Sequence, residues 1–168
     1  MIVIRSGVFE TNSSSTHAII IAREGTQPLD QVIFSIGEYG WKCDKFHDVN
    51  GKASYFYTAA CACLKRDVAD DICALLSPYG IKCLFYVRPK FVTYHSDSYG
   101  DSKYLDNGYI DHDMEALDFV EGLLGDTSQL IDFLFNDQSY VETGNDNDEE
   151  PVGTEIPDCN YIEYYKGN

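Results

Sequence analysis

The segment HAIIIA, residues 17–22, holds three consecutive isoleucines between two alanines. Beta-branched side chains favour extended backbone, so this run predicts a buried strand. MIVIR, residues 1–5, has a similar composition and predicts a second strand. We expect the two strands to pair across the loop that separates them, which places a β-sheet at the start of the chain.

Helical and strand-like patterns follow one another along the rest of the chain. Apolar side chains recur at helical spacing in segments 52–66 and 67–76 and again near residues 113–124. A fourth helix is expected to begin at Asp126, with Gln129 as its capping partner. The remaining pattern predicts strands at residues 31–36, 81–87, 90–95, 139–143 and 161–165, and polar loops at 37–51 and 96–108.

These elements predict one α+β domain over residues 1–168, with a mixed or antiparallel sheet and about four helices. The hydrophobic content of 44% is too high for a disordered chain. No apolar run approaches the roughly 18–20 residues that cross a bilayer. Arg5 follows only four residues, which leaves no room for a signal-peptide core, so we expect a cytoplasmic protein of a bacterial host cell.

The chain has six cysteines, and none of them forms a CxxC pair. Four of them fall inside apolar segments, so reduced thiols that act as small core residues are expected. A zinc site is the less favoured alternative.

The net charge of −16 is distributed unevenly along the chain. Residues 1–94 carry ten Lys/Arg and nine Asp/Glu, a net charge of +1, whereas residues 95–163 carry nineteen Asp/Glu and only Lys103, a net charge of −18. A surface this negative repels free DNA, free RNA and anionic membranes, and it attracts basic protein surfaces. The alternative is that the charge only keeps the protein soluble.

A polar motif, Phe9–His17, precedes the first quoted strand and contains a carboxylate, an amide, five hydroxyls and an imidazole. Together with Arg5, the side chains of Glu10 and His17 could supply the acid, the base and the cation that a metal-independent ribonuclease needs. The neighbouring polar residues could hold a phosphate through backbone N–H groups and side chains: Asn12, Ser13, Ser14 and Ser15. On residue chemistry alone a hairpin loop that satisfies its own backbone is the favoured alternative.

Two other polar segments are candidate parts of a site. Asp111 and His112 precede a predicted helix for which Asp113 is a candidate N-cap, and convergence with His17 and His95 would make a transition-metal site chemically sensible. The second segment, residues 143–150, has the composition of a calcium loop but lacks the glycine and terminal glutamate of an EF-hand. It predicts a solvated acidic loop, with contact between Asn145, Asp146 and the N-terminal motif as the alternative.

Other reaction classes are disfavoured because their motifs are missing. No serine lies in a Gly-x-Ser-x-Gly elbow, and the chain has neither a Walker pattern nor a dinucleotide-binding glycine pattern. We therefore expect no cofactor and no bound metal.

Three short blocks, FETNSSSTHA, GYIDHD and SYVETGNDND, resemble motifs of a family of small proteins from phages and mobile elements of low-GC Gram-positive bacteria. The resemblance covers about 26 residues of 168 and implies that Glu10–His17, Asp111–His112 and Asn145–Asp146 share one site. Small acidic proteins of phage origin include many anti-CRISPR inhibitors, some of which resemble nucleic acid in charge.

The function expected from charge and resemblance is inhibition of a nucleic-acid-guided nuclease, most concretely a type II CRISPR effector. The acidic part would dock on the basic surface of this partner, without tight binding of free DNA, and RNA held by the partner would be the further contact of the N-terminal part. The candidate partner contacts are Asp97, Asp101, Asp106, Asn145, Asp146, Asp148, Glu149 and Glu150. The alternative is an RNA phosphodiesterase that acts through Arg5, Glu10 and His17, with Asp111 and His112 as further catalytic candidates.

Overall fold

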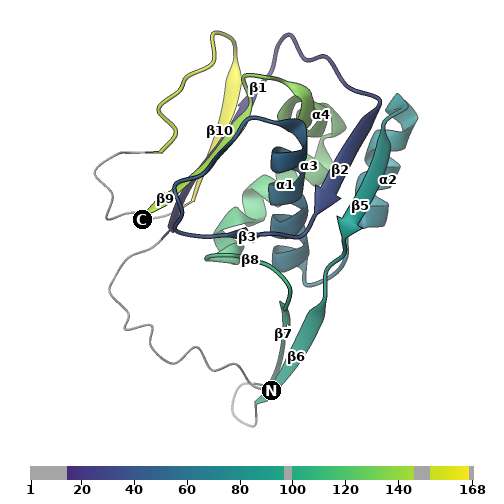
Figure 1. Ribbon diagram of the computed structural model, residues 1–168, viewed down its shortest axis with the longest axis vertical. Helices are drawn as coiled ribbons and strands as arrows, with labels where there is room; N and C mark the ends of the chain where they lie inside the picture. Colours follow the sequence, from purple (N-terminus) through teal and green to yellow (C-terminus); the bar gives the residue numbers. More distant parts are fainter. Residues whose placement is uncertain (1–14, 97–99, 146–151, 167–168) are drawn as a thin grey trace.

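The computed structural model describes residues 15–96, 100–145 and 152–166. Within these residues the chain is a single α+β unit with four α-helices, as expected from the sequence (Figure 1). A four-stranded sheet lies on one side of the central helix α1 (Val49–Leu64), and a two-stranded pair lies on the other side. No helix in the described part of the chain is long and apolar enough to cross a bilayer.

The four-stranded sheet is built around the isoleucine-rich strand. Its order is β10 (Tyr161–Lys166), β1 (Ser15–Ala22), β9 (Tyr140–Asn145) and β4 (Lys45–Phe46), with every neighbouring pair antiparallel. All eight residues of β1 are buried, which accounts for the continuous apolar run Ala18–Ala22, and the burial extends to the polar residues Ser15, Thr16 and His17.

The pairing expected for β1 is wrong. Over residues 17–20 it has β10 on one edge and β9 on the other, so neither edge is open there to the Met1–Arg5 segment. The strand expected at Met1–Arg5 itself lies outside the described residues. The error arises because composition identifies a strand but says nothing about which strand lies next to it.

Helix α1 contributes more buried residues to the hydrophobic core than any other described element. Its N-cap is Asp48, whose carboxylate accepts a hydrogen bond from the backbone N–H of Gly51 at 2.8 Å. The helix carries three consecutive aromatic residues, Tyr55–Tyr57, all fully buried. Phe56 packs edge-on against both Phe119 and Phe133, which joins α1 to α3 (Leu117–Gly125) and α4 (Thr127–Phe135).

The second pair of strands, β2 (Gln31–Ser35) and β5 (Lys82–Val87), is parallel and packs beside α1 and α2 (Ala69–Leu76). A short 3₁₀ helix, η1 (Ser77–Tyr79), ends α2 where the sequence predicts a stop. Residues 37–51, expected to be a loop, also contain the two-residue strand β3 (Glu38–Tyr39), the strand β4 and the start of α1. Such short strands are set by tertiary pairing, so sequence patterns do not reveal them.

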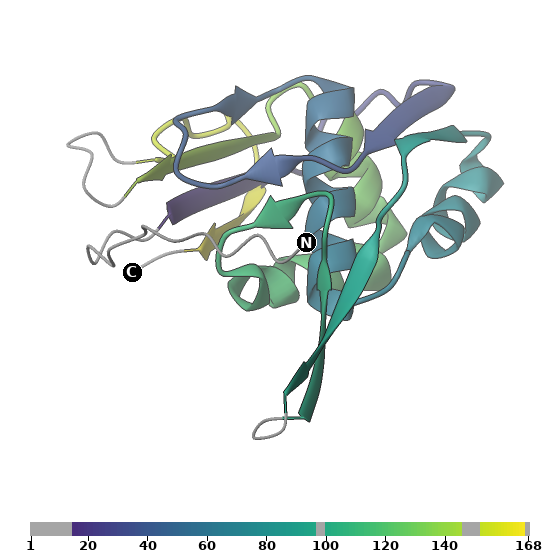
Figure 2. The ribbon, with the colours of Figure 1, turned by 60° about the horizontal axis from the view of Figure 1, so that its bottom comes forward.

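The segment expected to be a long polar loop, residues 96–108, contains a strand of six residues in its described part. β6 (Phe91–Ser96) and β7 (Gly100–Leu105) form an antiparallel hairpin that projects from the body of the molecule (Figure 2). Leu105 is the one buried residue of β7, so the strand lacks the alternation of apolar and polar residues by which strands are recognised.

The chain returns from the hairpin through β8 (Tyr109–Ile110) and a short 3₁₀ helix, η2 (Asp113–Ala116), before α3. The expected helix at 113–124 is thus a 3₁₀ turn followed by an α-helix. The predicted start of α4 is confirmed, because the Asp126 carboxylate caps the helix by accepting the N–H of Gln129 at 3.1 Å.

Candidate functional site

A cleft of about 840 Å³ lies between the β6–β7 hairpin and the short β3–β8 pair. Its walls include the carboxylates of Glu38, Asp106, Asp111 and Asp113. Among the described residues that line it, only His112 can carry a positive charge. The cleft is therefore strongly acidic.

The wall opposite the hairpin is positioned by close backbone contact. Tyr109 donates its N–H to the carbonyl of Gly37 at 3.1 Å, and Asp111 donates to the carbonyl of Tyr39 at 3.0 Å. A side chain at Gly108 would meet the Gly37 carbonyl oxygen at 2.5 Å, so glycine is needed where the chain passes this point. These contacts fix Asp111 at the end of the cleft.

Described residues of the three sequence blocks FETNSSSTHA, GYIDHD and SYVETGNDND lie close together beside this wall. Ser15 is paired with Asn145 in the register of β1 and β9, and its backbone N–H donates to Oδ2 of Asp111 at 3.3 Å. Nε2 of His112 lies 3.9 Å from the same carboxylate oxygen. The structure thus brings Ser15, Asp111, His112 and Asn145 together, and their catalytic or partner-binding roles stay predictions.

His112 has an uncommon backbone conformation. Its φ of 52° lies in the left-handed region, which few non-glycine residues adopt. The side chain is about half exposed, with Nδ1 3.5 Å from a carboxylate oxygen of Glu115. Backbone strain of this kind is often found at functional sites. The His112 side chain is 48% exposed and that of Asp111 is 26% exposed, so His112 is the more accessible of these two titratable groups.

His17 is placed differently from the expected catalytic base. It is completely buried, with Nδ1 2.8 Å from the Tyr55 hydroxyl and Nε2 3.3 Å from the carbonyl of Gly40. Because a carbonyl can only accept, Nε2 carries the proton in that contact and the hydroxyl donates to Nδ1. Burial also raises the pKa of Tyr55, which keeps the hydroxyl protonated. This arrangement favours a structural role, whereas a general base must reach the proton it removes.

Asp101 on the hairpin and Asp106 just after it, the two described acidic candidates for partner contact, are both exposed. Oδ1 of Asp101 lies 2.7 Å from Nδ1 of His95, across the β6–β7 pair. Asp106 follows the hairpin, and its backbone N–H bonds the carbonyl of Lys90 at 2.7 Å. His95 lies on the hairpin and His17 is buried, so the structure does not bring His17, His95 and His112 together as the metal-site alternative requires. Across residues 15–96, 100–145 and 152–166, no three His, Cys, Asp or Glu side chains are arranged to hold a metal ion.

Several sequence candidates lie outside the described residues, and their roles stay predictions: Arg5, Glu10, Asn12, Ser13, Ser14, Asp97, Asp146, Asp148, Glu149 and Glu150. Sequence reasoning did not single out Tyr94, Tyr104 or Glu38, which all line the cleft. Tyr94 and Tyr104 would have drawn attention only if the β6–β7 hairpin had been recognised, because alternation along paired strands then puts them on one face.

Comparisons of the chain with protein-family models, with curated proteins and with solved structures found no match. The functional argument therefore depends on this chain's own residues.

Proposed function

We propose that this protein docks on a basic, nucleic-acid-binding protein, most specifically a nucleic-acid-guided nuclease, and inhibits it by competing with nucleic acid. The observation that carries the proposal is the net charge of −18 over residues 95–163, beside a nearly neutral first part. Complementary charge accelerates encounter between such surfaces and selects against partners of like charge.

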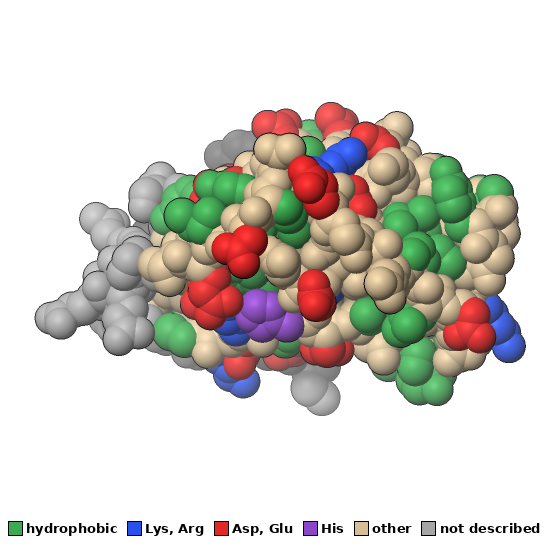
Figure 3. All heavy atoms as spheres, turned by 90° about the horizontal axis from the view of Figure 1, so that it is seen from above, with side chains coloured by type: hydrophobic (Ala, Val, Ile, Leu, Met, Phe, Trp, Pro, Cys, Tyr) green, Lys and Arg blue, Asp and Glu red, His purple; other side chains and the backbone are tan. Residues whose placement is uncertain are grey.

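The placement of the carboxylates supports this proposal. Exposed acidic side chains of residues 95–163 occur on the hairpin, on α3 and on the connections around the sheet, and they include Asp106, Asp118, Glu121, Asp137 and Asp158. One end of the molecule shows acidic side chains scattered among a few basic ones (Figure 3). Lys103, the only lysine or arginine of residues 95–163, lies with Nζ 4.6 Å from the centroid of the Phe91 ring. Among the described residues, basic side chains of the first part pair with four carboxylates of this part, Asp113, Asp132, Glu142 and Glu155, and so balance a minority of its nineteen negative charges.

The direct test is binding to a guide-loaded type II CRISPR nuclease at about 50 mM and about 300 mM NaCl, since screening weakens contacts between exposed charges. The wild-type protein should bind far more tightly at the lower salt concentration. The double variant Asp101→Lys/Asp106→Lys should bind about tenfold more weakly than the wild type at low salt.

The matched control is Asp30→Lys/Asp44→Lys, which makes the same charge change at two exposed positions of the neutral part. It should lose much less affinity. Equal loss in the two variants would mean that only net charge matters, and binding that ignores both salt and charge reversal would refute the proposal.

A second candidate is cleavage of RNA held by that partner. The observation that favours it is the junction of Ser15, Asp111 and the accessible His112. The surrounding carboxylates oppose capture of free RNA, so a basic partner would have to present it. Incubation with the guide-loaded nuclease, followed by a denaturing gel, should show shortened guide RNA for the wild type but not for His112→Ala. Intact RNA in both lanes would remove this candidate.

A further inference from the structure

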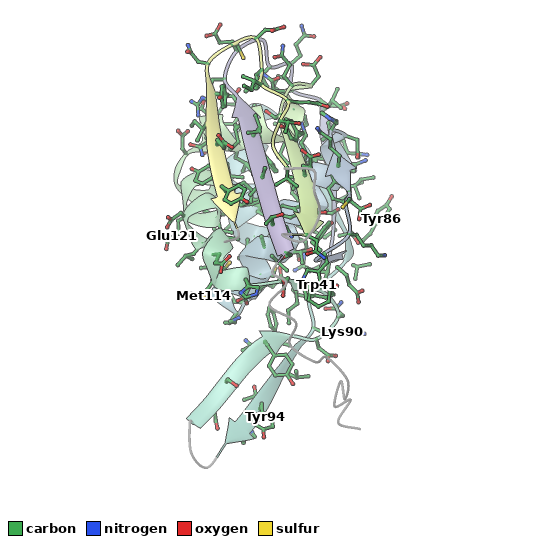
Figure 4. All side chains as sticks on the ribbon, turned by 90° about the vertical axis from the view of Figure 1, so that its left-hand side faces the viewer. Trp41, Tyr86, Lys90, Tyr94, Met114 and Glu121 are labelled. Atoms are coloured by element: carbon green, nitrogen blue, oxygen red, sulfur yellow. The ribbon has the colours of Figure 1, made fainter. Side chains whose placement is uncertain are left out.

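We infer that the cleft between the β6–β7 hairpin and the β3–β8 pair receives an arginine-bearing segment of the basic partner, with Tyr94 and Tyr104 as its aromatic wall. The inference rests on the proposed function, because it names where and how that docking occurs. It starts from the hairpin, which stands away from the body with Tyr94 near its outer part (Figure 4).

The two faces of the hairpin differ. Val92 is paired with Tyr104 and Tyr94 with Ser102, so these four side chains share one face. Val92, Tyr94 and Tyr104 all line the cleft, and the two tyrosines are 58% and 47% exposed. The cleft face thus presents two accessible aromatic rings to whatever enters.

The opposite face is occupied by contacts within the hairpin. There Lys103 lies over the Phe91 ring, and His95 meets Asp101 at 2.7 Å. The hairpin therefore already contains one cation–π contact, between Lys103 and Phe91. On the cleft face, the rings are available for a cation that comes from outside.

Carboxylates complete the site. Asp113 is neutralised by Lys65, whose Nζ lies 2.5 Å from it. Glu38 and Asp106 are exposed and take part in no ion pair among the described residues. An occupant that carries its positive charge on a flat group would pair with the carboxylates and stack on the tyrosine rings.

Arginine fits these two requirements better than lysine. Its planar guanidinium stacks on aromatic rings and offers paired N–H groups to a carboxylate, whereas the lysine ammonium is a strongly hydrated point charge. The volume of about 840 Å³ leaves room for a short peptide segment as well as one side chain. A second copy of this chain, with its net charge of −16, and a nucleic acid are both repelled.

The test uses dye-labelled octa-arginine and octa-lysine peptides and fluorescence anisotropy with the full-length protein. The wild type should bind octa-arginine more tightly than octa-lysine. Tyr94→Ser/Tyr104→Ser, which leaves the net charge unchanged, should weaken octa-arginine binding about fivefold or more and abolish the preference. Tyr79→Ser/Tyr86→Ser removes two other exposed tyrosines and should leave both affinities unchanged; Tyr86 lies on the body, away from the hairpin (Figure 4).

Tyr94→Phe/Tyr104→Phe keeps both rings and should keep the preference for arginine, which makes the result independent of any folding defect in the serine variant. Loss of the preference in the phenylalanine variant, or equal binding by the cleft and control serine variants, would overturn the inference. If the cleft tyrosines have no effect while Asp101→Lys/Asp106→Lys still weakens binding to the nuclease, the acidic docking stands and the arginine cleft alone is wrong.

Discussion

The backbone N–H of Ser15 donates to Oδ2 of Asp111 at 3.3 Å, although the two residues are 96 positions apart in the sequence. This bond joins the start of β1 to the chain that returns from the hairpin. It therefore links the central sheet to one wall of the acidic cleft. A substitution at either residue should therefore alter both the stability of the fold and the geometry of the candidate site.

Asp111→Ala should lower the free energy of unfolding by about 1–2 kcal/mol, because the N–H of the buried Ser15 loses a charged acceptor. Asp111→Asn keeps an acceptor oxygen and should lose less. Urea unfolding followed by circular dichroism measures both. An alanine variant as stable as the wild type would show that the bond does not hold these elements together.

The His17–Tyr55 contact should be structural. Tyr55→Phe leaves Nδ1 of a buried imidazole without its hydroxyl donor and should cost about 1–2 kcal/mol of unfolding free energy. The same variant should bind the guide-loaded nuclease as the wild type does, since both groups are fully buried. A large loss of binding in a stably folded Tyr55→Phe protein would assign this pair a functional role.

Lys52 should make stability depend on pH. Its side chain is fully buried and donates to the carbonyls of Asn136 and Ser139 at 2.7 and 3.0 Å. Burial lowers the pKa of Lys52 to about 8, against the opposing effect of the Asp48 and Asp137 carboxylates. Between this pKa and the ordinary lysine pKa, Lys52 is protonated in a larger fraction of the unfolded chains than of the folded ones. Its contribution to the free energy of unfolding therefore increases as the pH rises through this range.

The comparison with Lys52→Met isolates this effect from the other groups that titrate. Between about pH 7.5 and about pH 9.5, the unfolding free energy of the wild type should rise relative to that of the variant by about 2 kcal/mol. Parallel pH profiles for the two proteins would show that the pKa of Lys52 is not lowered.

The cysteines should differ sharply in reactivity. Burial raises the pKa of Cys61 to about 12 and that of Cys63 to about 12, so neither thiol ionises near neutral pH. Cys43 is exposed. Maleimide labelling of the native protein, read by mass spectrometry of peptides, should modify Cys43 quickly and Cys61 and Cys63 only after unfolding. Rapid native labelling of Cys61 would contradict the packing of α1.

Local chemistry made part of this fold predictable. The isoleucine run at 17–22 and the periodic helix at 52–66 have strong patterns because nearly every position is buried or follows one face. The Asp126 cap was predictable because it needs only residues three positions apart. These features depend on neighbours along the chain.

The hairpin and the cleft could not be predicted in the same way. β7 is exposed at five of its six positions, so its sequence lacks the apolar pattern that burial against a core would require. The cleft joins Glu38, from a two-residue strand, to Tyr94 and Tyr104 of the hairpin, and each pairing is decided by tertiary contacts. Its acidic character was visible in the charge distribution, but its aromatic wall was not.

The central claim is that the acidic part competes with nucleic acid for a basic protein surface. The most direct measurement is the fluorescence anisotropy of labelled target DNA bound to a guide-loaded type II CRISPR nuclease, titrated with this protein at low salt. The wild type should displace the DNA, and Asp101→Lys/Asp106→Lys should need about a tenfold higher concentration. No displacement by the wild type, or equal displacement by both proteins, would contradict the claim.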